Sequence, residues 1–365
     1  MKEAEHLQAD PDALLSDATP ASNPIAPDVE DRTAIAADPK YPLERRLEAF
    51  EDLIDSEVGD TAFSRARNLE REYGFRQLYL KFEGGNPTGT QKDRIAFAQA
   101  LDALRRGFEA ITVATCGNYG AALAMAAYHS GLRTVIYVPE TYHTRRFSEM
   151  ARFSAEIVRT PGTYEHAVEI SRQRAADDDI YDANPGGANT AIQLAAYGGI
   201  AYEIYDELRD APAVVSVAVS NGTTLAGIYR GFVSLYRRGK TSRIPRLVGG
   251  SSYKKNPIVL GWAGGAKSCA DLMPESIRET AINEPLVNWH SVDGDLALDA
   301  IRATCGFAGH VSDRNMMALS KKLRDQEGLN VLPAATAGLF TLLEHHKASP
   351  LPGDRYVAVL TGRKL

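Results

Sequence analysis

Short apolar segments that alternate with helical patterns constrain the fold of this chain more than any other feature. The segments lack strict polar alternation, so both faces of each predicted strand are expected to be buried, as in parallel sheets covered by helices on both sides. The sequence therefore predicts an α/β fold with two three-layer α/β/α domains and mostly parallel sheets. The predicted strands are Leu78–Glu83, Ala110–Thr115, Thr134–Val138, Ile157–Val158, Ile180–Tyr181, Val214–Val219, Arg246–Gly249 and Tyr356–Leu360. The predicted helices begin near Leu43 and Lys92 and then cover Tyr119–Ser130, His143–Phe153, Tyr164–Ala176, Leu194–Leu208, Thr224–Tyr236, Ser312–Glu327 and Thr336–His346.

The chain divides into three predicted parts. Residues 1–40 are rich in Asp, Glu, Ala and Pro and poor in large apolar groups, which predicts a mobile acidic tail or an arm over a partner subunit. Residues 41–84 together with 190–365 are predicted to form a large α/β domain, and residues 85–189 a small one. The loops that follow parallel strands should meet in a cleft between the two domains, which is the expected place for a ligand.

Composition narrows the class of partner. The chain has 365 residues, a net charge of −6 and no basic run longer than two residues, which argues against nucleic-acid binding. No apolar stretch reaches membrane-spanning length and no signal-like pattern opens the chain, so we expect a cytoplasmic protein that acts on a small molecule. The three cysteines, Cys116, Cys269 and Cys305, form no CxxC pair, so neither a metal site nor a disulfide framework is predicted.

Lys92 is the strongest candidate for chemistry. The segment Asn86–Arg94 is a Pro/Gly turn that leads from the strand Leu78–Glu83 into an apolar helix. At or near the start of that helix the dipole disfavours an ammonium, so this amine should deprotonate easily and attack a carbonyl, as in an imine with an aldehyde cofactor. The simpler interpretation is a solvent-exposed lysine of the first turn. A phosphate-binding P-loop is excluded, because Lys-Ser/Thr does not directly follow Gly89.

Three further segments place polar groups directly after predicted strands. Thr115–Gly120 offers a tight turn and helix-start amides that could seat a carboxylate, although Asn118 could simply cap the helix. Cys116 in this turn could be a nucleophile or a small buried side chain. Val219–Gly227 offers amides and hydroxyls that suit a phosphate dianion, or only a capped helix. Thr361 follows the last strand, where a hydroxyl is usually a cap.

Together these segments resemble the fold-type II pyridoxal-phosphate enzymes, the superfamily of threonine synthase, cysteine synthase and the tryptophan synthase β subunit. Asn-Pro-Thr-Gly-Thr-Gln-Lys-Asp-Arg at 86–94 is closely similar to the threonine synthase motif Asn-Pro-Thr-Gly-Ser-Phe-Lys-Asp-Arg. The resemblance runs from about Gly59 to the C-terminus. It implies pyridoxal 5'-phosphate as the cofactor, bound in the cleft between the domains, and a homodimer, which is the habit of the family.

The resemblance also assigns expected roles to particular residues. Lys92 would bond the cofactor, Asn118 would contact its ring oxygen, and Thr361 would face its pyridine nitrogen. A neutral hydroxyl at that nitrogen favours elimination and replacement over transamination. The expected phosphate loop is Ser220, Asn221, Gly222, Thr223 and Thr224, in which Ser220 and Thr223 replace glycines that are usual in the family. The expected substrate contacts are Thr115, Cys116, Gly117, Asn118, Tyr119 and Gln193.

The implied activity is that of a lyase of the threonine synthase type, acting on O-phosphohomoserine or a related γ-activated amino acid. Lys92 would first form the imine and then move protons on Cα and Cβ. Gln193 aligns where threonine synthases carry an arginine, and a neutral amide binds a phosphate dianion less well than a guanidinium does. Tyr119 replaces a small hydroxyl residue, and Gln91 replaces Phe. The pair Lys254-Lys255 could be a substitute cation site or a solvated loop.

Two other functions remain open at this point. Gly-Thr-Thr-Leu-Ala-Gly at 222–227 and Tyr197 favour β-replacement of the cysteine synthase kind on O-acetyl- or O-phosphoserine. A non-catalytic regulatory or assembly homologue is the third possibility. The presence of Lys92, Asn118 and Thr361 argues against it, because a scaffold has no need of all three.

Overall fold

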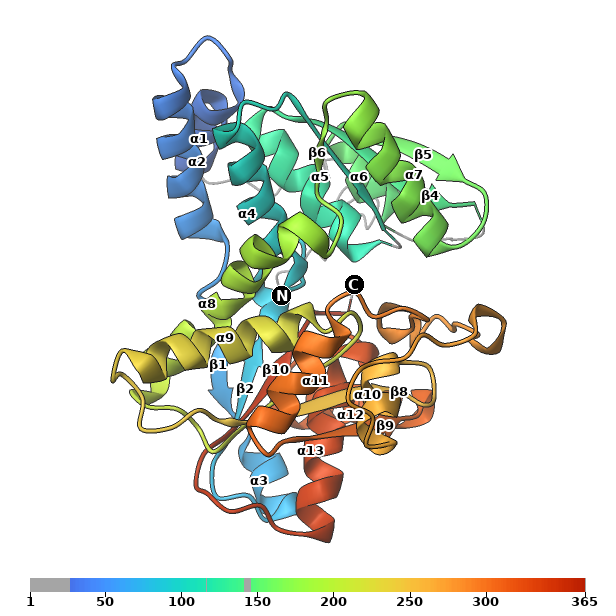
Figure 1. Cartoon of the computed structure of the whole chain (residues 1–365). Helices are drawn as coiled ribbons and strands as arrows, with labels where there is room; N and C mark the ends of the chain where they lie inside the picture. Colours follow the sequence, from blue (N-terminus) through green and yellow to red (C-terminus); the bar gives the residue numbers. More distant parts are fainter. Residues whose placement is uncertain (1–26, 116, 141–145, 365) are drawn as a thin grey trace, which may run out of the picture.

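The computed structural model describes residues 27–115, 117–140 and 146–364, which form two α/β units (Figure 1). The larger unit contains a six-stranded sheet in the order β1-β2-β10-β7-β8-β9, and the smaller one a four-stranded sheet in the order β5-β4-β3-β6. Neighbouring strands run parallel except β1, which is antiparallel to β2. The predicted α/β fold with mostly parallel sheets is therefore confirmed. The strands are β1 Phe63–Arg65, β2 Leu78–Phe82, β3 Ala110–Ala114, β4 Arg133–Pro139, β5 Glu156–Thr160, β6 Tyr181–Asp182, β7 Val214–Ala218, β8 Arg246–Ser252, β9 Phe307–Val311 and β10 Tyr356–Leu360.

Helices cover both faces of each sheet. The α-helices are α1 Pro27–Ala37, α2 Leu43–Glu57, α3 Arg67–Tyr73, α4 Lys92–Arg105, α5 Asn118–Ser130, α6 Phe147–Arg152, α7 Tyr164–Asp177, α8 Thr190–Leu208, α9 Thr223–Arg237, α10 Pro257–Ala263, α11 Gly294–Ala303, α12 Asp313–Glu327 and α13 Ala337–Ala348. The described residues also form five short 3₁₀ helices, which are η2 Glu83–Gly85, η3 Gly187–Asn189, η4 Pro274–Ser276, η5 Glu284–Leu286 and η6 Pro333–Thr336.

The large sheet shows why its strands are apolar throughout. Side chains alternate across a strand, and in β7 Val215 and Val217 belong to the same core cluster as α8 and α9. Their neighbour Val214 belongs to the opposite cluster with α12 and α13. Both faces of this strand are buried, so alternation with polar residues would place polar groups in a core.

Glycines let α8 and α9 pack closely. A Cβ atom at Gly231 of α9 would lie 2.6 Å from the carbonyl oxygen of Gly198 in α8, and one at Gly227 would lie 2.6 Å from Cβ of Tyr197. Because neither glycine has a side chain, the two helices approach until their backbones touch. This contact holds the first half of α9, which begins within the predicted phosphate loop at 220–224.

The N-terminal region differs from the sequence prediction. Within residues 1–40, for which a mobile tail or an arm over a partner subunit was expected, Pro27–Ala37 forms α1, and Val29 and Ala36 are buried against the rest of the protein. Residues 1–26 lie outside the described residues. Helix α2, predicted to belong to the large domain, packs instead on α4, where Phe50 stacks on Phe97 with 5.8 Å between ring centroids. The apolar face of α2 requires a helical partner, which α4 supplies. The predicted domain boundaries after residues 84 and 189 stay predictions.

Candidate functional site

Two neighbouring cavities meet at Lys92. The smaller has a volume of about 90 Å³ and the larger about 380 Å³, and Lys92, Asn118, Ser220 and Asn221 line both. Of the predicted site residues, Gly222, Thr223, Thr224 and Thr361 line only the smaller cavity. Thr115, Gly117 and Tyr119 line only the larger one. The structure therefore brings segments that are up to about 270 residues apart in sequence to one place, with Lys92 where the cavities join.

Lys92 is the first residue of α4. Burial lowers the pKa of its amine to about 8, and the nearby carboxylate of Asp293 partly opposes that shift. The backbone N–H of Lys92 donates to Oγ1 of Thr90 at 3.2 Å. About a tenth of the amine is thus unprotonated at pH 7 and about half at pH 8, and only that form attacks a carbonyl.

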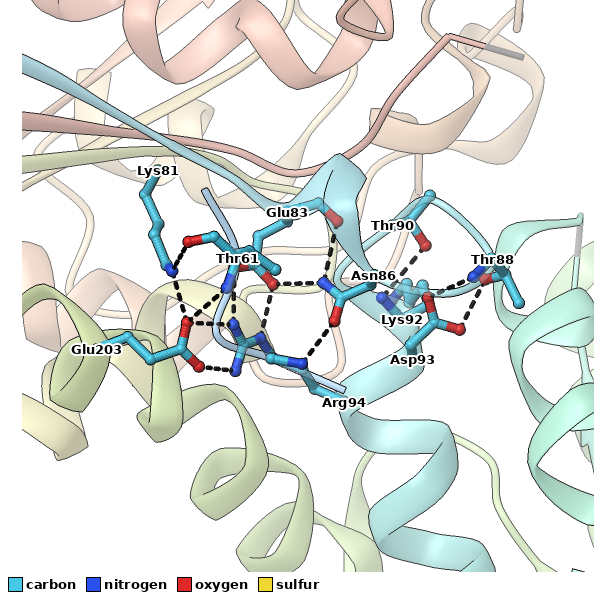
Figure 2. Close-up of polar contacts among 11 residues, drawn as sticks. Thr61, Lys81, Glu83, Asn86, Thr88, Thr90, Lys92, Asp93, Arg94 and Glu203 are labelled. Atoms are coloured by element: carbon cyan, nitrogen blue, oxygen red, sulfur yellow. Dashed lines mark hydrogen bonds and ion pairs between the residues drawn. The ribbon is translucent and has the colours of Figure 1, made fainter. Parts of the chain in front are cut away.

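The residues that follow Lys92 anchor the turn to both sides (Figure 2). The backbone N–H and the hydroxyl of Thr88 donate to the carboxylate of Asp93, at 3.0 and 2.7 Å. Arg94 donates to both carboxylate oxygens of Glu83, at 2.6 and 2.8 Å, and to both of Glu203, at 2.6 and 2.9 Å. Because Glu83 follows strand β2 and Glu203 lies on α8, Arg94 ties the start of α4 to two other elements.

A lysine completes this buried ion network. Lys81 on β2 lies 2.5 Å from the carboxylate of Glu203 and donates to the backbone oxygen of Thr61 (Figure 2). Burial alone would raise the pKa of Glu203, but hydrogen bonds and charge from Arg94 and Lys81 lower it to about 2. The carboxylate form of Glu203 therefore stabilises the folded state.

That shift predicts a loss of stability in acid. The pKa of Glu203 is lower in the folded protein than its ordinary value of 4.5, so its contribution is fully present above pH 4.5 and is lost as the pH falls toward 2. The loss amounts to about 3 kcal/mol over this range. Denaturant unfolding at several pH values should show the gap in free energy of unfolding between wild type and Glu203→Gln narrowing from pH 5 to pH 2. A gap that stays constant would contradict the assignment.

The pKa of Lys92 makes a separate prediction for cofactor capture. The rate at which cofactor-free protein takes up an aldehyde at Lys92 should rise about tenfold per pH unit below pH 8 and level off above it. Asp293→Asn removes the charge that raises this pKa, so the midpoint should move to lower pH. Stopped-flow absorbance at a series of pH values measures both profiles. A rate independent of pH between 6 and 8 would show that the amine is not the group that titrates.

Asn118 is the first residue of α5 and Gly117 occupies the N-cap position, so Asn118 does not cap the helix as the simpler interpretation supposed. Gly117 has a φ of 154°, and its N–H donates to Oγ1 of Thr115 at 3.1 Å. The hydroxyl of Tyr119 donates to the backbone oxygen of Ala183 at 2.8 Å and accepts from Gln99. The ring of Tyr119 remains as a wall of the larger cavity, with its centroid 5.5 Å from Nζ of Lys92. Cys116 lies outside the described residues.

Side chains of the loop before α9 form hydrogen bonds with Asn288 and Asp293. Gly222 has a φ of +92°, and a Cβ atom there would lie 2.6 Å from the backbone oxygen of Asp293. The hydroxyl of Thr223 donates to the carboxylate of Asp293 at 2.5 Å, and Oδ1 of Asn221 accepts from Asn288 at 2.8 Å. The first-turn N–H groups of α9 have no partner within the helix, which makes this end an anion seat beside the smaller cavity.

The last strand closes the smaller cavity. Thr361 follows β10, and its backbone oxygen accepts from the N–H of Gln91 at 3.0 Å. The N–H of Arg363 donates to the backbone oxygen of Gly89 at 2.8 Å. The turn before Lys92 is thus bonded to the segment that carries Thr361, so the amine and this hydroxyl line one cavity from opposite ends of the sequence.

Some predicted residues lie elsewhere. Gln193 is fully buried. Its amide nitrogen donates to Oε1 of Gln99, and its amide oxygen accepts from the N–H of Gly186. Gln193 is not among the described residues that line either cavity. Lys254 and Lys255 do not line them either, and Nζ of Lys255 donates to the backbone oxygen of Arg278. The suggested cation pair is therefore not part of the cavity.

Sequence reasoning missed several residues of the site. Asp293 accepts a hydrogen bond from Thr223, and its charge raises the pKa of Lys92, although no sequence motif surrounds Asp293. Glu165, Glu279 and Glu284 line the larger cavity, where Lys92 is the only cation among the described lining residues. Glu165 lies in α7 and Glu284 in η5, whereas Asp293 and Glu279 lie between helices. No sequence motif marks any of these residues.

The site has the parts that a fold-type II pyridoxal-phosphate enzyme requires. The cradle at Gly222, the anion seat at α9 and an amine of lowered pKa fit the phosphate and the aldehyde of that cofactor. The chain matches the family described as pyridoxal-phosphate dependent enzyme over residues 54–362, and it belongs to this family. It is accordingly a pyridoxal-phosphate-dependent lyase that resembles the threonine synthases.

The relatives agree with this class. Threonine synthase of Methanocaldococcus jannaschii is 31% identical over 312 residues, which cover 84% of this chain and 75% of that protein. Threonine synthase of a Bacillus species, strain ULM1, is 29% identical over 84% of this chain and 83% of its own length. Among solved structures, a pyridoxal 5'-phosphate-dependent aspartate racemase has a TM-score of 0.72 at 19% identity, covering 87% of this chain and 94% of its own. At that identity the likeness shows the fold, which confirms the predicted fold type.

Proposed function

We propose that this enzyme acts on an amino acid whose γ-oxygen is activated, with O-phosphohomoserine as the substrate and threonine as the product to test first. The observation that carries the proposal is the junction of the two cavities at Lys92, where one amine reaches both a cofactor seat and a substrate-sized space. The threonine synthase relatives support a γ-activated substrate.

Each residue then has a defined task. When bound, pyridoxal phosphate supplies an aldehyde that bonds an amine and a ring that draws electrons from the adjacent carbon. Lys92 holds the cofactor and, once released by the substrate amine, moves protons at the substrate's Cα and Cβ. The N-terminus of α5, at Asn118, seats the substrate carboxylate. Thr361 offers the ring nitrogen a neutral hydroxyl, which supports elimination and replacement.

The second candidate is β-replacement on O-acetyl- or O-phosphoserine, and the lining of the larger cavity favours the acetyl ester. The described residues that line this cavity include no arginine. A phosphate dianion is bound best by a guanidinium, whereas an acetyl ester needs no cation. The non-catalytic alternative is not retained, because the chain belongs to an enzyme family and Lys92 stands at the junction of the cavities.

A substrate titration separates the two candidates. Cofactor-loaded wild type and Lys92→Ala are mixed with O-phosphohomoserine, O-phosphoserine and O-acetylserine while visible absorbance is followed and products are separated. Threonine and phosphate formed from O-phosphohomoserine only by the wild type support the proposal. A spectral change and product with O-acetylserine, and none with O-phosphohomoserine, would replace it with β-replacement.

A further inference from the structure

One buried arginine donates a hydrogen bond to the side chain of Asn118. Arg146, at the start of α6, is 4% exposed, and its Nε donates to Oδ1 of Asn118 at 3.1 Å. Its Nη2 donates to the backbone oxygen of Thr88 at 2.7 Å, and its Nη1 to Glu149 at 2.6 Å. One guanidinium therefore contacts both the loop that carries Asn118 and the turn that carries Lys92.

The chemistry of the two side chains removes an ambiguity in the asparagine amide. The oxygen of an asparagine only accepts hydrogen bonds and its nitrogen only donates them, and the two ends look alike in shape. A guanidinium has no acceptor, so the amide oxygen must face Arg146. The nitrogen of Asn118 then points the other way. Because Asn118 lines both cavities, a fixed donor is left on the cavity side.

We propose that Arg146 is a positioning residue, which orients the amide of Asn118 so that its nitrogen donates to the ring oxygen next to the cofactor's aldehyde. That oxygen is an acceptor, and it lies beside the carbon that bonds Lys92. A rotated amide would set oxygen against oxygen and lose the bond. The contact of Arg146 with Thr88 also keeps the Asn118 loop and the Lys92 turn at a fixed separation. This inference rests on the cofactor and not on the identity of the substrate.

The experiment is a double-mutant cycle on cofactor affinity. The dissociation constant of pyridoxal phosphate and the visible absorption maximum of the bound cofactor are measured for wild type, Arg146→Gln, Asn118→Ala and the double variant. Arg146→Gln should weaken binding about tenfold and move the absorption maximum as Asn118→Ala does. In the Asn118→Ala background it should add little, because the residue it acts through is gone. Additive effects, or an unchanged maximum in Arg146→Gln, would overturn the proposal.

Two more variants guard against a general loss of structure. Glu149→Gln removes the partner on the exposed side of Arg146 and should leave both quantities unchanged. Asn118→Asp keeps an acceptor for Arg146 but lacks the donor, so it should bind the cofactor at least tenfold more weakly while Arg146 stays intact. Wild-type affinity in Asn118→Asp would refute the donor role even if Arg146→Gln failed to fold.

Discussion

Replacing Lys92 by alanine is expected to lower kcat by about three to four orders of magnitude, because one side chain both holds the cofactor and moves the protons. Both tasks need a primary amine that loses its proton near neutral pH, and burial lowers the pKa of Lys92 to about 8. The measurement is single-turnover and steady-state product formation with the substrate that the titration selects.

A matched variant tests whether Lys92 acts as an amine that loses its proton or only as a positive charge. Lys92→Arg keeps a cation of similar length, but a guanidinium does not deprotonate in proteins, so it should be as inactive as alanine. The exposed Lys321→Ala should retain full activity. Activity in Lys92→Arg above a tenth of the wild-type rate would mean that Lys92 acts only as a charge.

Replacing Glu83 by glutamine is expected to destabilise the protein by about 3–5 kcal/mol. Glu83 is fully buried and accepts two hydrogen bonds from Arg94 and one each from Thr61 and Asn86 (Figure 2). The amide leaves the guanidinium of Arg94 with a buried, partly uncompensated charge. Because Arg94 is two residues after Lys92, cofactor affinity should fall together with stability.

Denaturant unfolding of the cofactor-free protein measures this effect, and the chain offers a matched control. Arg105 and Glu51 form an exposed ion pair at 2.8 Å, with about half of each side chain accessible. Glu51→Gln should therefore cost less than about 1 kcal/mol, because solvent screens exposed pairs. Equal losses of unfolding free energy in Glu83→Gln and Glu51→Gln would show that burial of the ion network does not increase its contribution to stability.

Much of the fold could be predicted because local patterns agree with tertiary packing. The apolar segments at 110–115, 214–219 and 356–360 became β3, β7 and β10, since strands buried on both faces leave a clear signal. Strand β1 has only three residues, and β9 contains Gly309 and His310 and is half-buried. Neither segment therefore has a sequence pattern that distinguishes a strand from a loop. Helix α1 was missed because its buried apolar side chains are few: Val29 and Ala36 lie in the core, and Ile35 packs against it.

The candidate site likewise contains residues that the sequence predicted and residues that it did not. Lys92, Asn118 and the loop at 220–224 stand in contiguous motifs at strand ends, and parallel sheets bring strand ends together. Asp293 and Arg146 act across about 70 and 30 residues of sequence, and a single charged residue carries no pattern. Gln193 was placed by alignment with an arginine, but its amide is used inside the protein. The predicted homodimer and cytoplasmic location stay predictions.

We expect the cofactor to bond Lys92 at the junction of the two cavities. Borohydride reduction of the loaded enzyme, followed by peptide mass spectrometry, tests it directly, because reduction makes the link between lysine and cofactor permanent. We expect one equivalent of reduced cofactor on the peptide that contains Lys92, and none in Lys92→Ala. Cofactor found on another lysine, or no adduct in folded and loaded protein, would show that Lys92 does not hold the cofactor.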